Sequence, residues 1–542
     1  MDASSTSASP TDAATADARN STSYDAIFVG GAFSSASCAL LLKQRRPEAR
    51  ILLVEARDHG ERKVGEVGEA TVEVSGCFLH RNLGLYDHLS REHLPKHGLR
   101  YWFTDGPERK LREMSEVGPT MVPPLPSFQL DRGLLDEHLL DLAEEAGCEV
   151  LRPAKVESVE TGWPVTTVEV ATDEGPRTLT TRWLLDGSGR RTFLARRLGL
   201  KEREERHPVA ALWGRWEGVL DLDSAEMLTD RPGKPGLPPT AAARRLATNH
   251  FCGYGWWCWV IPLANGRTSI GLVYDKSLLE LPGSGPVEAR YVDFLRVQPG
   301  LRELLADAQP IDGEFMAYSH LPYRSRRYMD RGWGLLGDAA AFIDPFYSPG
   351  LDHAVISAFA TARIVGDDLE SAVDEDGLDR LIAEHNSQFC RSYDRWLLGL
   401  YENKYELMGD AELMACTYLV DTALYYLGVV TPVYTVPEAL ANPILGLPNR
   451  SASIAYRILR LFNRRMLRLA RVRRRNGTYG RRNIGWRLTN KPFGLHHKTL
   501  SPLFQGLRLW LRLELSALGG RWRSGGSTES LPTTESAATE PG

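Results

Sequence analysis

The sequence lacks the cysteine patterns of metal-binding and disulfide-rich proteins. Its seven cysteines are spread over 542 residues, their number is odd, and no two of them form a CxxC pair. Zinc sites and secreted disulfide frameworks need paired cysteines at short spacings, so we expect no metal site and no disulfide scaffold. Reduced cysteines are typical of the cytoplasm, and we expect the protein to act there.

Long apolar runs and a strong charge excess are also missing. Because the chain has no run of eighteen or more apolar residues, the sequence predicts no transmembrane helix. A net charge of −4 argues against nucleic-acid binding by the protein as a whole. Residues 1–23 have neither the basic segment nor the apolar core of a signal peptide, and their Ser, Thr, Ala and Asp content predicts a disordered leader. Residues 521–542 predict a disordered tail.

The first patterned segment predicts a nucleotide-binding βαβ unit. Residues 24–31 (YDAIFVGG) are an apolar run that ends in glycine, and residues 36–46 have helical periodicity. Residues 51–55 (ILLVE) are a second apolar run that ends in an acid. A right-handed crossover makes two such strands parallel, so the predicted fold class is α/β with a Rossmann-like unit.

The loop of this unit is a degenerate phosphate-binding loop. Positions three and six of the GxGxxG pattern hold Ala32 and Ser35. Small residues still let a diphosphate approach the backbone N–H groups of the helix N-terminus, and Glu55 stands where an acid binds a ribose hydroxyl. An ordinary α/β turn is the alternative. The predicted cofactor contacts here are Gly30, Gly31, Ala32, Ser34, Ser35 and Glu55.

Three later segments are similar to elements of the aromatic-hydroxylase flavoproteins. Residues 186–191 (DGSGRR) follow an apolar strand and resemble the D-G/A-x-G-R-x-S element. Asp338 ends another strand, and Arg132 precedes a predicted helix over residues 134–146. The resemblance implies that Asp186, Gly187, Asp338 and Arg132 contact FAD; a turn glycine, a capping aspartate and a surface arginine are the structural alternatives. Because no second βαβ fingerprint follows, we expect FAD and no bound nicotinamide nucleotide.

Four further motifs resemble those of the flavin-dependent halogenases. Residues 257–262 (WCWVIP) match W-x-W-x-I-P, and residues 67–71 (VGEAT) match a second family segment, although Glu73 replaces its proline. Residues 95–101 (PKHGLRY) resemble the segment that carries the catalytic lysine, and residues 344–350 (DPFYSPG) match D-P-x-x-S-x-G. The resemblance covers about residues 24–370.

This resemblance implies the role of each residue. Lys96 is the catalytic lysine, and burial would lower its pKa; an exposed lysine is the alternative. Trp257, Trp259 and Tyr347 lie beside the flavin and separate it from the substrate. The halide lies at Ser348, Pro349 and Gly350, and FAD also contacts Pro345, Gly350 and Leu351.

The implied activity is FADH2- and O2-dependent chlorination or bromination of an electron-rich aromatic compound through hypohalous acid. A separate NAD(P)H-flavin reductase supplies the FADH2, and the substrate is free or carrier-bound. Tyr347 occupies the position of the glutamate of the tryptophan halogenases, which favours a phenol or pyrrole over tryptophan. A flavin monooxygenase and a geranylgeranyl-reductase-like enzyme are the alternatives on this fold.

The C-terminal region predicts helices, and one of them is strongly basic. Residues 453–475 combine Ile454, Ile458, Leu461, Phe462 and Leu469 with many arginines. This pattern favours a helix packed on the body with a solvated basic face; a docking helix for an anionic membrane or an acidic carrier protein, as in a partner subunit, is the alternative. The predicted division is FAD-binding domain, 24–205 and 325–370; inserted β-rich substrate domain, 206–324; and helical C-terminal region, 371–520.

Overall fold

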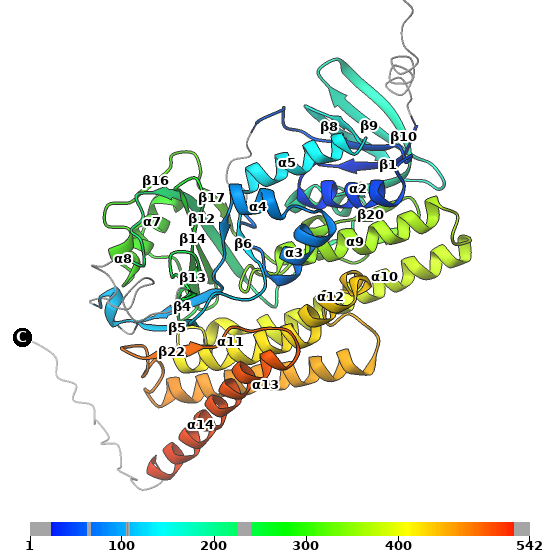
Figure 1. The fold of residues 1–542 in the computed structure, drawn as a ribbon. Helices are drawn as coiled ribbons and strands as arrows, with labels where there is room; N and C mark the ends of the chain where they lie inside the picture. Colours follow the sequence, from blue (N-terminus) through cyan, green and yellow to red (C-terminus); the bar gives the residue numbers. More distant parts are fainter. Residues whose placement is uncertain (1–22, 62–66, 105, 107–108, 225–239, 525–542) are drawn as a thin grey trace, which may run out of the picture.

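The computed structural model describes residues 23–61, 67–104, 106, 109–224 and 240–524 (Figure 1). The predicted leader lies outside the described residues except for Ser23, which opens the first strand. The predicted tail begins too early, because the last helix continues to Ser524; the rest of that tail lies outside the described residues.

A parallel sheet carries the nucleotide-binding unit, as the apolar runs predicted. Its strand order is β19-β20-β10-β1-β2-β7, and β8 and β9 form an antiparallel extension of β10. Helix α2 packs on α9 and α5 beside the sheet, because its buried face is built from small and aliphatic side chains such as Ala36, Ala39 and Leu42. The strands are β1 (Ser23–Val29), β2 (Ile51–Val54), β7 (Glu149–Leu151), β8 (Ala154–Glu160), β9 (Thr166–Thr172), β10 (Gly175–Asp186), β19 (Met329–Asp330) and β20 (Trp333–Leu335).

A second, larger sheet stands next to the first in Figure 1 and has the order β16-β12-β15-β14-β13-β4-β5-β22, with β17 on β12. It extends beyond the predicted substrate domain, because β4 runs parallel to β13 and β22 runs parallel to β5. Its strands are β4 (Leu99–Phe103), β5 (Ser115–Pro119), β12 (Val209–Glu217), β13 (Thr248–Gly253), β14 (Trp256–Pro262), β15 (Thr268–Asp275), β16 (Gln309–Pro310), β17 (Met316–Tyr318) and β22 (Arg487–Asn490).

Two minor sheets join these parts: β11 (Lys201–Arg203), β18 (Tyr323–Ser325) and β21 (Ala341–Phe342) form one, and β3 (Leu94–Pro95) and β6 (Phe128–Gln129) form the other. The helices of the nucleotide-binding and sheet regions are α2 (Phe33–Arg45), α3 (Glu73–Cys77), α4 (Tyr86–Glu92), α5 (Arg132–Glu145), α6 (Phe193–Arg197), α7 (Val287–Val297), α8 (Leu301–Leu304) and α9 (Gly350–Leu369).

The C-terminal helices cover the junction of the two large sheets. Helix α11 packs against α14 and α13, and all but four of its residues are buried. The segment Ala411–Thr435 is long and apolar enough to cross a membrane by length and composition, although 67% of its most apolar window is buried inside the protein, as in a core helix. The helices are α10 (Glu375–Trp396), α11 (Ala411–Tyr425), α12 (Thr431–Thr435), α13 (Arg450–Arg475) and α14 (Leu500–Ser524).

Candidate functional site

The turns after β1, β10 and β20 meet where these parallel strands end, at the predicted nucleotide site; we call these three turns the cradle. Gly30 has a φ of +86°, and a Cβ on it would lie 3.3 Å from the carbonyl oxygen of Gly187. A Cβ on Gly337 would lie 2.7 Å from Ser34 Oγ. These contacts explain why the turns after β1, β10 and β20 each carry a glycine: a side chain would force the turns apart.

The start of α2 suits a diphosphate. Its N-cap, Ala32, offers no side-chain hydrogen bond, and the first turn contains no acid, so the positive end of the helix dipole is not neutralised locally. The Oγ of Ser35 is buried and has no hydrogen-bond partner among the described residues. Glu55 is 6% exposed, and its Oε2 accepts a hydrogen bond of 2.7 Å from the Gly31 N–H.

Two residues predicted to bind the cofactor, Asp186 and Asp338, make hydrogen bonds that hold the loops of the cradle. Asp186 is fully buried, and its carboxyl group accepts hydrogen bonds from the N–H groups of Ser188 at 2.9 Å and Leu194 at 2.7 Å. It therefore holds the turn around Gly187 and the start of α6 in place. The carbonyl oxygen of Asp338 accepts a hydrogen bond of 2.6 Å from the Tyr323 hydroxyl, while its half-buried side chain lies in the turn that touches Ser34.

Arg132 links the cradle to the VGEAT segment. Its guanidinium donates to both carboxylate oxygens of Asp136 at 3.0 Å and to the Val67 carbonyl at 2.9 Å, and it lies 5.4 Å from the ring centroid of Phe33. Gly68 has a φ of +95°, and a Cβ there would lie 2.6 Å from Arg132 Nη1 and 3.8 Å from Leu351. Arg132, Gly68 and Leu351 thus meet at the start of α9.

The two tryptophans of the WCWVIP motif lie on β14 with their indole rings 5.8 Å apart. Trp259 lies across Gly271 of β15, where a Cβ would come within 2.0 Å of the ring, and its Nε1 donates to Ser269 Oγ at 3.1 Å. Trp257 is 1% exposed and packs edge-on against Phe346 at 5.1 Å. The motif is therefore packed directly against the DPFYSPG loop.

A buried polar network fixes this contact. The Trp257 Nε1 donates to the Tyr405 hydroxyl at 2.9 Å, and that hydroxyl donates to Asp344 Oδ2, also at 2.9 Å. His207 Nε2 lies 2.7 Å from the same oxygen, and the Phe346 N–H donates to Asp344 Oδ1 at 2.8 Å. Asp344 therefore joins the loop, β14 and the C-terminal helical region.

The loop itself has an unusual backbone. Tyr347 and Ser348 have φ values of +71° and +56°, a region that non-glycine residues seldom adopt. The Tyr347 hydroxyl lies 3.3 Å from Asp421 Oδ2, and the Lys404 ammonium lies 4.9 Å from the Tyr347 ring centroid and pairs with Asp421. These contacts hold Ser348, Pro349 and Gly350 at the N-terminus of α9, and a Cβ on Gly350 would meet nothing within 4 Å.

Lys96 is 4% exposed, so it is not a surface lysine. Its Nζ donates to the Thr71 carbonyl at 2.8 Å, which ties it to the VGEAT segment. Burial lowers the pKa of this ammonium to about 8, while the nearby carboxylates of Glu73 and Asp352 oppose that shift. The side chain is thus poised to exchange a proton near neutral pH.

Lys96 lines a cavity of about 400 Å³ that is mostly apolar. Tyr347 and Pro349 of the loop line the same cavity, so the structure brings the predicted lysine and the predicted halide loop together. Most of the remaining wall comes from the C-terminal region, for which the sequence carries no motif. The polar and aromatic residues of the wall include Glu73 of α3 and Asp352 of α9, together with Tyr401, Tyr418, Tyr425, Tyr426 and Phe493 of the C-terminal region.

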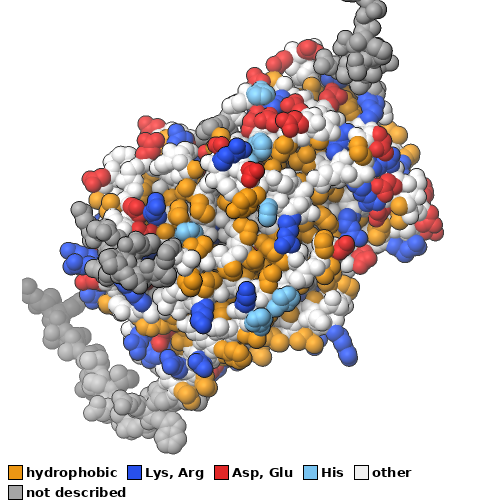
Figure 2. Space-filling model, viewed as in Figure 1, with side chains coloured by type: hydrophobic (Ala, Val, Ile, Leu, Met, Phe, Trp, Pro, Cys, Tyr) orange, Lys and Arg blue, Asp and Glu red, His pale blue; other side chains and the backbone are white. Residues whose placement is uncertain are grey.

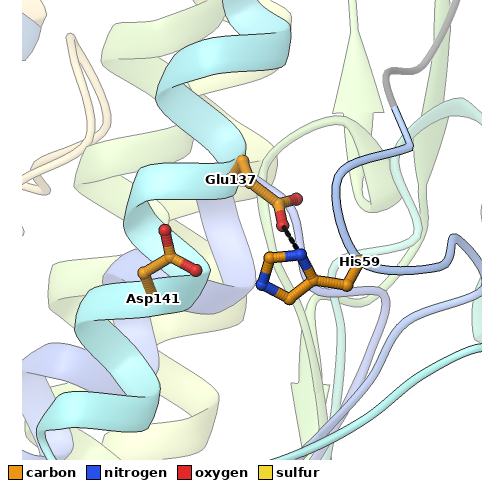
Figure 3. A group of neighbouring side chains, drawn as sticks. All are labelled: His59, Glu137 and Asp141. Carbon is orange, nitrogen blue, oxygen red and sulfur yellow. Dashed lines mark ion pairs between the residues drawn. The ribbon is translucent and has the colours of Figure 1, made fainter.

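In the described part of the chain, one group of side chains has the ligand types and spacing of a metal site. His59, Glu137 and Asp141 lie close together (Figure 3), with His59 Nδ1 3.9 Å from Glu137. Arg152 already approaches Glu137 at 2.7 Å and Asp141 at 3.8 Å, and His59 is 71% exposed. The group is explained as a surface ion-pair cluster.

Comparisons with known proteins agree with this geometry. The family model of the tryptophan halogenases matches residues 107–394, more than half of the chain. The chain is 24% identical over 454 residues to the flavin-dependent halogenase chlA of Dictyostelium discoideum, covering 76% of this chain and 70% of that protein. It is 24% identical over 358 residues to a 1H-pyrrole-2-carbonyl-[peptidyl-carrier protein] brominase of Pseudoalteromonas luteoviolacea, covering 65% and 78%.

A solved structure shows the same fold. The halogenase PltM in complex with phloroglucinol and FAD superposes with a TM-score of 0.68 at 20% sequence identity, over 85% of this chain and 94% of that chain. The α/β FAD-binding fold and FAD as the cofactor are thereby confirmed. The cradle described above fits that cofactor, because its uncapped helix N-terminus and close glycine turns leave room for a diphosphate. The chain belongs to the tryptophan halogenase family and is a flavin-dependent halogenase.

Proposed function

We propose that this enzyme uses FADH2, O2 and chloride or bromide to halogenate an electron-rich aromatic compound of the phenol or pyrrole type. The observation that carries the proposal is the position of Lys96. It is buried in the same cavity as Tyr347 and Pro349 of the DPFYSPG loop. An amine enclosed in this way can act on an oxidised halogen species before that species escapes to solvent.

Bound FADH2 would activate O2, which is the oxidant that converts halide into hypohalous acid. In our proposal the protein holds the reactants: the backbone N–H groups at the start of α9, next to Ser348, Pro349 and Gly350, favour an anion. The side chains of Trp257, Phe346 and Tyr347 form one aromatic cluster next to this region, in which Phe346 contacts both other rings, with centroid distances of 5.1 Å and 4.5 Å. In our proposal this cluster shields the flavin from the aromatic substrate.

Lys96 then delivers the halogen. With a pKa of about 8, the side chain is mostly ammonium at pH 7 and can donate a hydrogen bond to the oxygen of hypohalous acid, which makes the halogen more electrophilic. The minor neutral form can instead take the halogen as a haloamine. Both routes need the amine inside the cavity with the aromatic substrate.

The cavity wall favours a planar, electron-rich ring. Tyr401, Tyr418 and Phe493 line it with aromatic surface, which stacks well on a phenol or pyrrole. Tyr347 replaces the glutamate of the tryptophan halogenases, and an activated ring needs less help to lose its proton. In this proposal a separate NAD(P)H-dependent reductase provides FADH2, and the carrier-bound pyrrole named for one relative makes a tethered substrate the second option.

The test is a product assay with FAD, a flavin reductase, NADH and bromide, over a panel of phenols, pyrroles and indoles read by mass spectrometry. We expect a bromide-dependent product and at least a 100-fold loss in Lys96→Met while FADH2 oxidation continues. Lys43→Met is the matched control, because Lys43 is also buried and also donates to backbone carbonyls, those of Pro47 and Ala49. An oxygenated product without halogen would indicate a monooxygenase, a reduced product would indicate a reductase, and retained halogenation in Lys96→Met would exclude the lysine mechanism.

A second role, docking to an anionic membrane surface, is supported by α13 and α14. Phe462 and Leu469 of α13 are buried, as the favoured interpretation of a packed helix predicts. Ile454 and Ile458 are 54% and 51% exposed, and Leu461 is 70% exposed. Helix α14 adds four exposed apolar side chains at the same helical spacing: Phe504, Leu507, Leu511 and Leu515.

Basic residues flank this apolar face, and apolar and basic side chains lie next to one another over the C-terminal helices in Figure 2. Helix α13 contains no acid, and its Arg457, Arg464 and Arg468 are exposed. An apolar stripe bordered by arginines fits the interface of an anionic bilayer. The same helix lines the substrate cavity with Ala455 and Leu459, so docking would bring the cavity close to a lipophilic substrate.

Co-sedimentation with vesicles containing phosphatidylserine tests this role. We expect binding that salt weakens, that Leu461→Glu reduces, and that Gln at the three exposed α13 arginines abolishes. Gln at Arg203, Arg326 and Arg327, which are exposed on another part of the protein, is the charge-matched control. Equal binding by both triple variants would exclude the docking face; no binding to vesicles together with binding to an acidic carrier protein would assign the face to the carrier.

A further inference from the structure

Asp352 is a buried carboxyl group that the mechanism above does not use. It is the third residue of α9, is 1% exposed, and lines the cavity with Lys96. Its Oδ1 accepts a hydrogen bond of 2.9 Å from the Ser75 N–H, and its Oδ2 accepts one of 2.6 Å from the Tyr425 hydroxyl. Both donors are neutral, and the groups with the largest effect on the pKa of Asp352 include no arginine or lysine.

A structural carboxylate at this depth normally has a cationic partner, or two backbone N–H donors as Asp186 has. Asp352 instead has a pKa raised to about 7 by burial, against the lowering effect of its hydrogen bonds to Tyr425 and Ser75. The charged groups that face it across the cavity are Lys96 and Glu73, each on a different element. The group can therefore take up and release a proton under working conditions.

The position that holds a glutamate in the tryptophan halogenases is Tyr347 here, and this phenol cannot replace it as a base. Burial and the neighbouring Asp421 raise the pKa of Tyr347 well above its usual value, and its hydroxyl faces Asp421. Among the residues that the structure describes, three carboxyl groups line the cavity: Glu73, Asp352 and Asp421. Asp421 is paired with Lys404, and Asp352 lies five residues after Tyr347 on the same segment.

We propose that Asp352 is the catalytic base that accepts the ring proton during halogenation; this inference rests on the proposed function. A π pair of the ring forms the carbon–halogen bond, and the halogen–oxygen bond breaks with its electrons on oxygen. The Lys96 ammonium gives that oxygen a proton, so water leaves. The pair of the ring C–H bond then restores aromaticity, and its proton moves to the Asp352 carboxylate. Return of this proton from Asp352 to the Lys96 amine restores both groups, so the net change consumes one hypohalous acid, replaces one ring hydrogen by halogen and yields one water.

The test compares Asp352→Asn with Glu73→Gln, since the two carboxyl groups line one cavity and each accepts a tyrosine hydroxyl at 2.6 Å. Three readouts are taken: halogenated product, hypohalous acid captured by a small 1,3-diketone, and the rate ratio for ring-protonated and ring-deuterated phenol. In Asp352→Asn we expect product formation to fall at least 50-fold and a hydrogen isotope effect of about three or more to appear. Hypohalous acid formation and FAD affinity should stay within twofold of the wild type.

The pH profile adds a second criterion. In the wild type, halogenation should rise with pH through about 7 as Asp352 ionises, and this limb should disappear in Asp352→Asn and remain in Glu73→Gln. Asp352→Glu should recover part of the rate, which a folding defect in Asp352→Asn would not explain.

Other results overturn the proposal. An isotope effect confined to Glu73→Gln would show that Glu73 accepts the ring proton. Loss of captured hypohalous acid in Asp352→Asn would show that Asp352 is needed for the formation of hypohalous acid. Absence of captured hypohalous acid in the wild type itself would contradict the proposed function rather than the choice of base.

Discussion

Tyr405→Phe is a sharp test of the buried network that joins the loop to β14. The variant removes one hydroxyl that accepts from the Trp257 Nε1 and donates to Asp344, both at 2.9 Å. The indole N–H is then left without an acceptor at a site 1% exposed, which costs about 1–3 kcal/mol, and the lost hydrogen bond to Asp344 adds about 1 kcal/mol. We expect a total destabilisation of about 2–4 kcal/mol.

Thermal unfolding provides the measurement. A chain of 542 residues has an unfolding entropy of about 1.1 kcal/mol/K, so the expected Tm decrease is about 2–4 °C. Tyr401→Phe is the control, because Tyr401 is equally buried but makes a single hydrogen bond, of 2.8 Å, to the Phe346 carbonyl. Its expected decrease is about 1 °C. Halogenated product per FADH2 oxidised should also fall in Tyr405→Phe, because Trp257 is no longer held against the loop.

Equal Tm shifts in the two variants would show that the Trp257 indole N–H does not depend on the Tyr405 hydroxyl. The double variant Tyr405→Phe/Trp257→Phe tests this cause, because it has no indole N–H to leave unpaired. Its Tm decrease should be smaller than the sum of the decreases of the two single variants.

Three further changes test other parts of the site. Gly68→Ala places a Cβ 2.6 Å from the Arg132 guanidinium at a φ of +95°, so we expect at least a tenfold weaker Kd for FAD by flavin fluorescence, whereas Gly60→Ala, also at positive φ but with no atom within 4 Å, should bind normally. Lys404→Met leaves Asp421 buried without its cation and should lower the Tm by about 3–5 °C, against less than 1 °C for Arg471→Met at an exposed pair with Glu406. Asp352→Asn should gain stability relative to the wild type as pH rises from about 4 to 7, because the unfolded aspartate ionises first while the folded one has a pKa near 7. The gain should level off above pH 7 at no more than about 4 kcal/mol, and a constant difference across that range would show that the carboxyl group is not perturbed.

The FAD-binding part of the fold could be predicted from local sequence. The apolar runs that became β1 and β2 pair in parallel as expected, and the helix before Gly147 begins at Arg132, two residues earlier than its periodicity indicated. Burial of Lys96 also agrees with the motif context, which outweighed the usual exposure of lysine.

The cavity could not be predicted, because its wall depends on contacts between segments far apart in the chain. Tyr425 reaches Asp352 over 73 residues, and Tyr426 reaches Glu73 over 353 residues. A local pattern carries no signal for such pairs. The prediction of the second sheet left out β4, β5 and β22 for the same reason, since β22 pairs with β5 across more than 300 residues of sequence.

Most of the residues that line the cavity lie beyond residue 394, where the match to the family model ends. In the proposed mechanism, the oxidising core and the compartment for the aromatic ring are therefore encoded in different stretches of the chain. Substitutions in α11, α13 or the segment around Phe493 can reshape the space for the ring while leaving the glycine turns and the loop at Ser348 untouched. If the proposed mechanism holds, exchanging this C-terminal stretch between relatives should change which ring position is halogenated.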